Sequence, residues 1–285
     1  MELKVSYKKE YRIIITDFIR TKVKETGAAG VVLGLSGGVD SAVVAALALE
    51  ALGKERVHCL IMPYDTTVEK EAVNDALLMV EEFHLSGEVV PIEKGVNAVF
   101  DAINEDTHKE MRRKAEGNVK ARLRMVMLYY YANLHNYLVL GTSNKSELLV
   151  GYFTKYGDGG TDAMPIGDLY KTQVFSLSEE LRIPDKIREK SPSAGLFEGQ
   201  SDEKELGIRY SELDRILYGI EQRLSLAEIS EITGIPLETV ERVQRMVYSA
   251  AHKRFLGMIP KLGIRTPGYD WRENVSFLPF SHKSF

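Results

Sequence analysis

The chain has 285 residues, of which 44% are hydrophobic and 27% are charged, and its formal net charge is −4 at pH 7. This composition is that of a globular chain that buries a core, and the charge gives no general attraction to nucleic acid or to an anionic membrane. The single cysteine, Cys59, excludes an intrachain disulfide, and no apolar run reaches the roughly 18 residues that cross a bilayer. Because residues 1–11 also lack the core of a signal peptide, we expect a cytoplasmic protein with no membrane partner.

Helices and strands are predicted to alternate through the first half of the chain. Apolar residues at helical spacing predict a helix over about residues 8–26, and the apolar run 31–33 predicts a buried strand. The later elements are expected at about 41–52 (helix), 56–62 (strand), 66–83 (helix), 88–92 (strand), 96–103 and 118–133 (helices) and 137–140 (strand). This alternation predicts an α/β fold: a doubly wound, mostly parallel, five-stranded Rossmann-like sheet with helices on both faces, followed by a helical C-terminal part.

The first strand runs into a small glycine-rich turn, Gly34-Leu35-Ser36-Gly37-Gly38-Val39-Asp40-Ser41, and a helix begins directly after it. Such a junction binds anions, because glycine lets the backbone approach a ligand and the first turn of a helix leaves N–H groups unpaired. The turn is neither a Walker A loop, since it lacks Gly-Lys-Ser/Thr, nor a dinucleotide fingerprint, since the third glycine is missing. Asp40 would repel a phosphate unless a cation lies between them, so it indicates Mg²⁺. The alternative is an ordinary tight turn with a Ser or Asp cap.

A second turn of this kind follows the fourth strand, at residues 141–147. In a doubly wound sheet the fourth strand lies beside the first, so this turn and Asp40 are expected at one rim, beyond the carboxyl ends of the strands. Glu147 is then placed to share a cation with Asp40, with phosphate oxygens and water completing the shell. In residues 151–171, glycines and aspartates exclude a helix or a strand while aromatic residues argue against disorder, so we expect a functional loop.

The last third of the chain is predicted to be helical, at about 209–218, 225–233 and 237–251. Residues 225–242 look like a helix-turn-helix, which would bind DNA; the alternative is a helical pair packed on the sheet domain or on a partner. We favour packing, because Glu238 and Glu241 stand at the start of the second helix and would repel phosphate.

Several blocks of sequence together resemble one family. Residues 36–41 (Ser-Gly-Gly-Val-Asp-Ser) are similar to the loop of the N-type ATP pyrophosphatases, which adenylate a carboxylate or carbonyl oxygen and release pyrophosphate. Residues 117–125, 140–147, 154–162 and 201–208, with His252-Lys253, look like the ammonia-dependent NAD synthetases and occur in that family's order. The resemblance implies a ligase that amidates deamido-NAD with ammonia through an NAD-adenylate intermediate. ATP would be the co-substrate, and NAD, AMP and pyrophosphate the products of this last step of NAD biosynthesis.

The resemblance also implies roles for individual residues. Asp40 and Glu147 would bind Mg²⁺ and act with Lys171 in catalysis, while Asp158 would help to hold ammonia. ATP would be bound by Gly34, Leu35, Ser36, Gly37, Gly38, Val39, Asp40, Ser41, Thr142, Lys171 and Ser193. Deamido-NAD would be bound by Lys155, Asp162, His252 and Lys253 and by Arg122, with Arg124 close enough to take its place. The family often has Thr at position 193, and it often has Asp-His where this chain has Ser143-Asn144.

The family's organisation implies a single NAD synthetase domain over 1–285 that forms a homodimer, with the interface helping to build the substrate site. Its parts would be a nucleotide-binding core (about 30–172), a mobile lid that closes over ATP (189–207), a helical extension (209–262) and a tail (263–285). A glutamine-using enzyme normally needs an amidase domain with a nucleophilic cysteine, and Cys59 lies in a predicted buried strand. Ammonia is therefore expected to be free or to come from a separate partner.

Two other functions stay open. Another ATP pyrophosphatase that amidates or thiolates a nucleotide, such as a GMP synthetase-like or tRNA-thiolating enzyme, would share residues 36–41 but not 154–162. A DNA-binding regulator would sense a nucleotide with the sheet domain and read DNA with the C-terminal helices. The adenylation hypothesis fits these residue types best. Both steps of the reaction gather negative charge and therefore need cations and oriented N–H donors.

Overall fold

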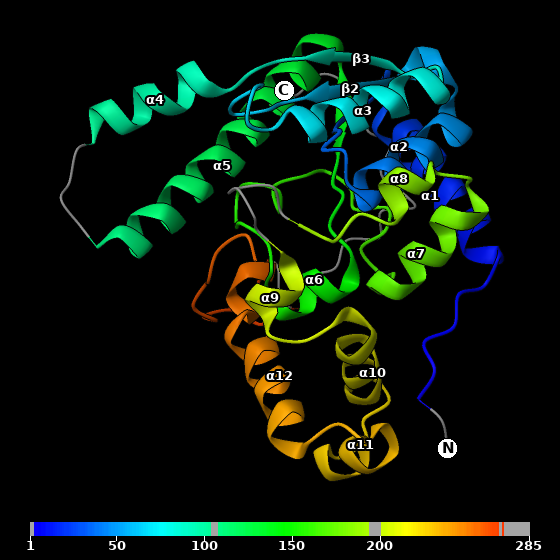
Figure 1. Ribbon diagram of the computed structural model, residues 1–285, viewed down its shortest axis with the longest axis vertical. Helices are drawn as coiled ribbons and strands as arrows, with labels where there is room; N and C mark the ends of the chain where they lie inside the picture. The colour runs from blue at the N-terminus through cyan, green and yellow to red at the C-terminus, as the bar shows by residue number, and fades with distance from the viewer. Residues whose placement is uncertain (1–2, 104–107, 194–200, 268–269, 271–285) are drawn as a thin grey trace.

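A parallel sheet lies at one end of the molecule (Figure 1). The structure is a computed structural model that describes residues 3–103, 108–193, 201–267 and 270. The strands are β1 (Gly30–Gly34), β2 (Val57–Ile61), β3 (Ser86–Val89) and β4 (Tyr137–Leu140), in the order β3-β2-β1-β4. The chain winds outward from β1 to β3 and then returns to place β4 on the other side of β1, as the doubly wound prediction required.

Within the described residues the sheet has four strands, where five were predicted. Beyond β4 a bridge joins Leu140 to Ala163, and this pairing does not lengthen into a strand because Pro165 has no N–H to add to the ladder. β3 begins earlier than predicted, but the Val90 N–H donates to the Ile61 carbonyl and continues its pairing.

Helices cover both faces of the sheet, as predicted. On one face α1 (Glu10–Thr26), α2 (Val39–Leu52), α3 (Lys70–Glu82) and α7 (Lys171–Glu180) share an apolar cluster with Val31 and Leu33 of β1. On the other face α4 (Glu93–Ala102) and α5 (Lys109–His135) share a second cluster with Val32. Successive residues of β1 thus enter opposite clusters and are fully buried, which fixes the strand that leads into the glycine-rich turn.

α4 and α5 extend from the sheet as an arm (Figure 1). α5 begins at Lys109, well before the predicted start at 118. The first part of α5 is charged and exposed, so it carries no apolar period from which a helix could have been predicted.

The remaining helices are α6 (Lys145–Val150), α8 (Asp185–Arg188), α9 (Asp202–Leu206), α10 (Tyr210–Glu221), α11 (Leu226–Thr233) and α12 (Leu237–Ser249), with 3₁₀ turns η1 (Lys54–Arg56) and η2 (Ala251–Arg254). α10, α11 and α12 gather at the end of the molecule away from the sheet (Figure 1). They form a third cluster in which Ile229, Val240 and Val243 are fully buried beside Val150 of α6. The helical pair is therefore packed, as favoured over a free DNA-binding unit.

Two predicted segments fall only partly within the described ranges. Residues 194–200 of the predicted lid, and 268–269 and 271–285 of the predicted tail, lie outside the described residues. Within the part of the chain that the structure describes, no helix has the length and apolar character to cross a membrane.

Candidate active site

The turn after β1 approaches α3 closely. Gly37 has φ of +77°, and a Cβ there would lie 2.4 Å from the Ala72 carbonyl oxygen, so only glycine fits. The hydroxyls of Ser36 and Ser41 lie 3.1 Å apart, and Ser36 Oγ accepts a hydrogen bond from the Gly38 N–H. α2 begins directly afterwards with Gly38 as its N-cap residue, so no side chain caps it and its first N–H groups stay available to an anion. Leu35 and Val39 are buried, so they can meet a ligand only through their backbone.

Three charged side chains from three elements meet at this rim. Lys171, the first residue of α7, places Nζ 2.5 Å from Asp40 Oδ2 and 3.5 Å from Glu147 Oε1. The Lys171 side chain is 2% exposed, so its ammonium is enclosed between the two carboxylates. The topology predicted that Asp40 and Glu147 share a rim, and the structure places them on either side of one cation.

Asn144 joins the two carboxylates through hydrogen bonds. Its Nδ2 donates to Asp40 Oδ1 at 2.9 Å, and its Oδ1 accepts from the Glu147 backbone N–H at 3.1 Å. Glu147 Oε2 accepts in return from the Asn144 backbone N–H, which completes a capping box at the start of α6. Asn144 is fully buried, so the positions of both carboxylates depend on one amide side chain.

The charges of this group shift one another's protonation. Burial, followed by the charge of Asp40, raises the pKa of Glu147 to about 8, against the opposing effect of Lys171. Burial alone would lower the pKa of Lys171, but the charges of Asp40 and Glu147 outweigh it and raise that pKa above its ordinary value. Two acidic groups thus face one basic group, so a further positive charge at this place would be electrostatically favourable.

The donor set of this rim suits a small divalent cation. Asp40 and Glu147 both direct an oxygen toward the point where the Lys171 ammonium lies, and carboxylate oxygens are the ligands that Mg²⁺ prefers. Among the described residues no three His, Cys, Asp or Glu side chains gather in a geometry that could hold a metal. A cation held by these two carboxylates would therefore need phosphate or water oxygens to complete its shell.

The two arginines named as alternatives have different surroundings. Arg122 is exposed, and its Nε donates to the Lys155 carbonyl at 3.3 Å, which brings it to the 151–171 loop. Arg124 is partly buried; its Nε donates to the Met62 carbonyl at 2.8 Å, and its Nη2 lies 3.4 Å from Glu69 Oε2. Arg122 is thus the one whose guanidinium faces solvent, while Arg124 braces the segment that follows β2.

The 151–171 loop is ordered around its own polar side chains. Asp158 Oδ1 accepts from the Thr154 N–H at 2.9 Å, and desolvation of the carboxyl raises the pKa of Asp158 although the residue as a whole is exposed. Asp162 accepts from the Tyr129 hydroxyl and from the Val139 N–H, at 3.0 and 2.8 Å, so both of its oxygens already have partners. Asp158, Asp162 and Asp168 are all exposed residues, so exposure alone does not single out one carboxylate of this loop.

The C-terminal basic residues lie against the same loop. The Lys253 ammonium donates to the carbonyls of Gly151 and Phe153, at 2.7 and 2.9 Å. The Lys155 ammonium donates to the carbonyl of His252 at 3.0 Å, and His252 itself is exposed. The sequence-distant blocks 154–162 and 252–253 are thus adjacent. Of the remaining candidates, Thr142 is half-buried directly after β4, and Ser193 is exposed beside the undescribed segment 194–200.

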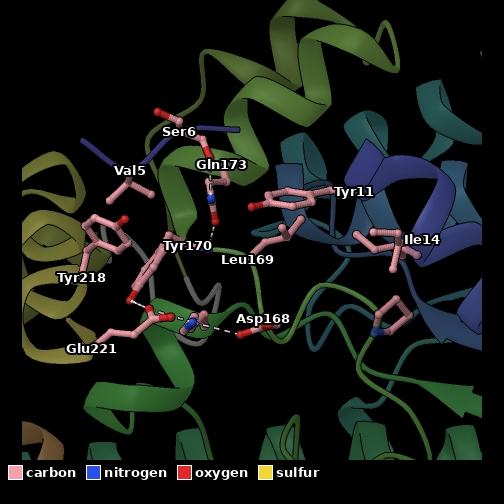
Figure 2. Close-up of a pocket in the computed structure, with 13 residues that line it drawn as sticks. Val5, Ser6, Tyr11, Ile14, Asp168, Leu169, Tyr170, Gln173, Tyr218 and Glu221 are labelled. Atoms are coloured by element: carbon pink, nitrogen blue, oxygen red, sulfur yellow. Dashed lines mark hydrogen bonds and ion pairs between the residues drawn. The ribbon is translucent and has the colours of Figure 1, made fainter. Parts of the chain in front are cut away.

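A cavity of about 320 Å³ opens on the other side of the helix starts (Figure 2). Lys145 lies in it 3.0 Å from Asp168 and 2.9 Å from Glu221, and the Tyr170 hydroxyl donates to Glu221 at 2.5 Å. These charged groups are paired with one another, and Asp40, Glu147 and Lys171 do not line the cavity. The candidate site is therefore the rim beside the glycine-rich turn, which lies outside this cavity.

Sequence reasoning missed three residues at this site. Asn144 was noted only as a departure from a family pattern, although Asn-x-x-Glu before an apolar run is a capping-box signal. Asp202 is 3% exposed, and burial raises its carboxyl pKa, with the charge of Lys171 opposing that rise. Asp214 is fully buried at the starts of α6 and α7. Nothing in the local sequence of either aspartate signals burial.

The comparisons with known proteins agree on one family. A model of the NAD synthase family matches residues 12–257. The NH(3)-dependent NAD(+) synthetase of Pyrococcus horikoshii is 47% identical over 247 residues, which are 86% of this chain and 92% of that protein.

Two solved structures have the same architecture over most of the chain. NMN synthetase from Francisella tularensis superposes with a TM-score of 0.76 at 33% identity, covering 90% of this chain and 100% of that one. The NH3-dependent NAD synthetase from Campylobacter jejuni superposes with a TM-score of 0.74 at 32% identity, covering 89% and 99%.

Proposed function

The chain belongs to the NAD synthase family, and on that premise we propose that it amidates deamido-NAD with ammonia in an ATP-dependent reaction that gives NAD, AMP and pyrophosphate. The observation that carries the proposal is the meeting of Asp40, Glu147 and Lys171 beside a turn whose N–H groups are open to phosphate. Cations and N–H donors at one rim are what a reaction between two anions requires.

In the first step the ATP triphosphate lies on the turn after β1, where the first N–H groups of α2 donate to its oxygens. The nicotinate carboxylate oxygen attacks the α-phosphorus, the bond to the β-phosphate oxygen breaks, and pyrophosphate leaves. Lys171 stabilises the negative charge that gathers at the α-phosphate, and for this its ammonium turns from the two carboxylates toward the ligand when a metal ion takes its place between them.

In the second step ammonia attacks the carbonyl of the acyl adenylate, and AMP leaves. Ammonium must first lose a proton, and Asp158 is the carboxylate that we propose to hold it and accept that proton. Two features support this role: Asp158 is an exposed residue, and desolvation raises the pKa of its carboxyl above the ordinary value.

Asp40 and Glu147 are the residues that we propose to hold Mg²⁺, since their oxygens converge and are short of positive charge. When bound, the metal would neutralise phosphate charge and orient the triphosphate. The basic side chains around the 151–171 loop, those of Arg122, Lys155 and His252, suit the anionic pyrophosphate of deamido-NAD. Lys253 and Asp162 support them by fixing that loop.

We also propose a homodimer. Apolar side chains of α4, α5 and the turn after α4 are exposed although they are large: Val99, Ile103, Met111, Val126, Tyr130 and Leu134. A second copy of the chain laid on this arm would cover them. The expected compartment is the cytoplasm, where ATP is available and Cys59 stays reduced.

The function is tested by incubating the protein with deamido-NAD, ATP, Mg²⁺ and ammonium and separating the nucleotides by chromatography. NAD, AMP and pyrophosphate are the expected products, whereas ADP and phosphate would contradict adenylation. Asp40→Asn and Glu147→Gln should abolish turnover without unfolding the protein, because each side chain lies at a partly open rim.

The same assay separates the alternatives. Nicotinate mononucleotide in place of deamido-NAD tests for the activity named for the Francisella tularensis relative. XMP tests for a GMP synthetase-like enzyme, and glutamine in place of ammonium tests for another nitrogen source. Faster turnover of any of these than of deamido-NAD with ammonium would replace the proposal.

A further inference from the structure

A carboxylate that the proposed reaction does not use lies at the starts of two helices. Asp214, on α10, is fully buried. Its Oδ1 accepts a hydrogen bond from Ser146 Oγ at 2.5 Å, and its Oδ2 accepts from the Thr172 backbone N–H at 2.8 Å. Ser146 Oγ accepts in turn from the Lys171 backbone N–H at 3.0 Å. One side chain from the helical C-terminal part therefore holds the first turns of both α6 and α7.

These hydrogen bonds satisfy backbone N–H groups that are unpaired at the start of any helix. The first N–H groups of a helix have no partner within it, and burying them without one costs about 1–3 kcal/mol each. At the start of α7 the N–H of Lys171 is buried and that of Thr172 is partly buried, and both are satisfied by the Asp214–Ser146 pair. A negative charge at a helix N-terminus is also favoured by the helix dipole.

The anchored atoms are next in sequence to the reactive side chains. Ser146 directly precedes Glu147, and Thr172 directly follows Lys171. A shift of α6 against α7 would change the 3.5 Å separation between Lys171 Nζ and Glu147 Oε1. We propose that Asp214 is a positioning residue, which sets the distance between Glu147 and Lys171 by tying the starts of α6 and α7 to α10. Its kinetic test rests on the proposed function; its structural test does not.

α10 offers a second carboxylate that makes a useful comparison. Glu221 contacts Lys145, the first residue of α6, and Tyr170, the N-cap residue of α7, so it joins the same two helix starts (Figure 2). It does so from the open cavity, and its side chain is 43% exposed. Water can replace its hydrogen bonds, so Glu221→Gln should disturb the site less than a change at Asp214.

Two substitutions of Asp214 distinguish its role as a hydrogen-bonded bridge from its role in filling space. In Asp214→Asn the amide oxygen can accept from Thr172 N–H while the amide nitrogen donates to Ser146 Oγ, so the bridge can re-form. In Asp214→Leu the branched shape is kept, with methyl groups that are larger than the carboxylate oxygens, and the bridge is lost. We expect kcat to fall about 10- to 100-fold in the Leu variant, and Asn to restore most of it. The KM for deamido-NAD should stay within about twofold in both, because Arg122 and Lys155 are unaffected.

Hydrogen–deuterium exchange measured by mass spectrometry gives a readout that needs no turnover. In Asp214→Leu, exchange should rise in peptides that cover 144–150 and 170–174 and stay unchanged elsewhere. Glu180→Gln is the matched control: it loosens the far end of α7, where Glu180 contacts Tyr7 and Arg12, and should change neither kcat nor these peptides. If Asp214→Leu fails to fold, Ser146→Ala replaces it and should raise exchange at Lys171 and lower kcat.

Two results would overturn the inference. Equal kcat values in folded Asn and Leu variants would show that only volume matters at position 214. Faster exchange throughout the protein would show that the residue supports global stability alone. If wild-type protein forms no NAD at all, the proposed function fails, while the exchange measurement still decides whether Asp214 anchors the two helix starts.

Discussion

Replacing Lys171 with methionine tests whether Asp40 and Glu147 form a cation site. Methionine keeps much of the side-chain length but removes the ammonium that lies 2.5 and 3.5 Å from the two carboxylates. Removing one partner of a buried ion pair costs about 3–5 kcal/mol. The Asp40 and Glu147 side chains are 17% and 14% exposed and can still reach water, so we expect about half of that cost. The result is a loss of about 2 kcal/mol, or a fall in Tm of about 4 °C for a chain of this size.

Mg²⁺ should reverse part of this loss, because ligands that bind the folded state stabilise it and the two carboxylates of the variant lack a cation. In differential scanning calorimetry without ATP, millimolar Mg²⁺ should raise the Tm of Lys171→Met more than that of the wild type. Lys145→Met is the control: Lys145 also joins two carboxylates, but those of Asp168 and Glu221 are exposed and already hydrated. An equal Mg²⁺ effect in all three proteins would refute the shared-cation site.

Gly37→Ala should be less stable and should raise the KM for ATP, because the new Cβ would lie 2.4 Å from the Ala72 carbonyl oxygen and the positive φ alone costs about 1–2 kcal/mol. Urea denaturation and initial rates measure both effects, and an unchanged KM would contradict the placing of ATP on this turn. Arg122→Ala should raise the KM for deamido-NAD at constant Tm, whereas Arg124→Ala should mainly lower Tm, because its guanidinium braces the segment after β2. Equal effects of the two would contradict this division. Burial raises the pKa of Cys59 to about 12, so its thiol should react with a thiol reagent at about pH 8 only after unfolding. Rapid labelling of the native protein would contradict the packing of β2.

The meeting of Asp40 and Glu147 could be predicted from the sequence because it depends on topology. The two residues are far apart in the chain, but each follows a strand of a parallel sheet, and neighbouring parallel strands end at the same edge. The apolar runs of β1 and β4 were strong enough to identify those strands. Lys171 was different: only the family resemblance pointed to it, since no spacing rule connects the start of α7 with that edge.

Asn144 and Asp214 show where sequence reasoning stops. The pattern Asn-x-x-Glu can identify Asn144 as a helix cap, but its bond to Asp40 depends on how closely two separate turns approach each other. Asp214 looks like one more acid on an amphipathic helix. Its burial arises only when α10 packs over the starts of α6 and α7, and that is a contact between elements far apart in the chain.

The charges of the site do not by themselves explain why it holds together. Enclosing an ammonium and two carboxylates costs desolvation that can offset their attraction. The geometry is instead fixed by bonds to backbone N–H groups: Asn144 caps α6, and Asp214 with Ser146 holds the start of α7. The hydrogen bonds of Asn144 depend on the sheet, and those of Asp214 depend on the helical C-terminal part. Both parts of the molecule are therefore needed to place Lys171. On this proposal the C-terminal helices belong to the scaffold of the candidate active site, although none of the residues proposed to hold Mg²⁺ or phosphate comes from α10, α11 or α12.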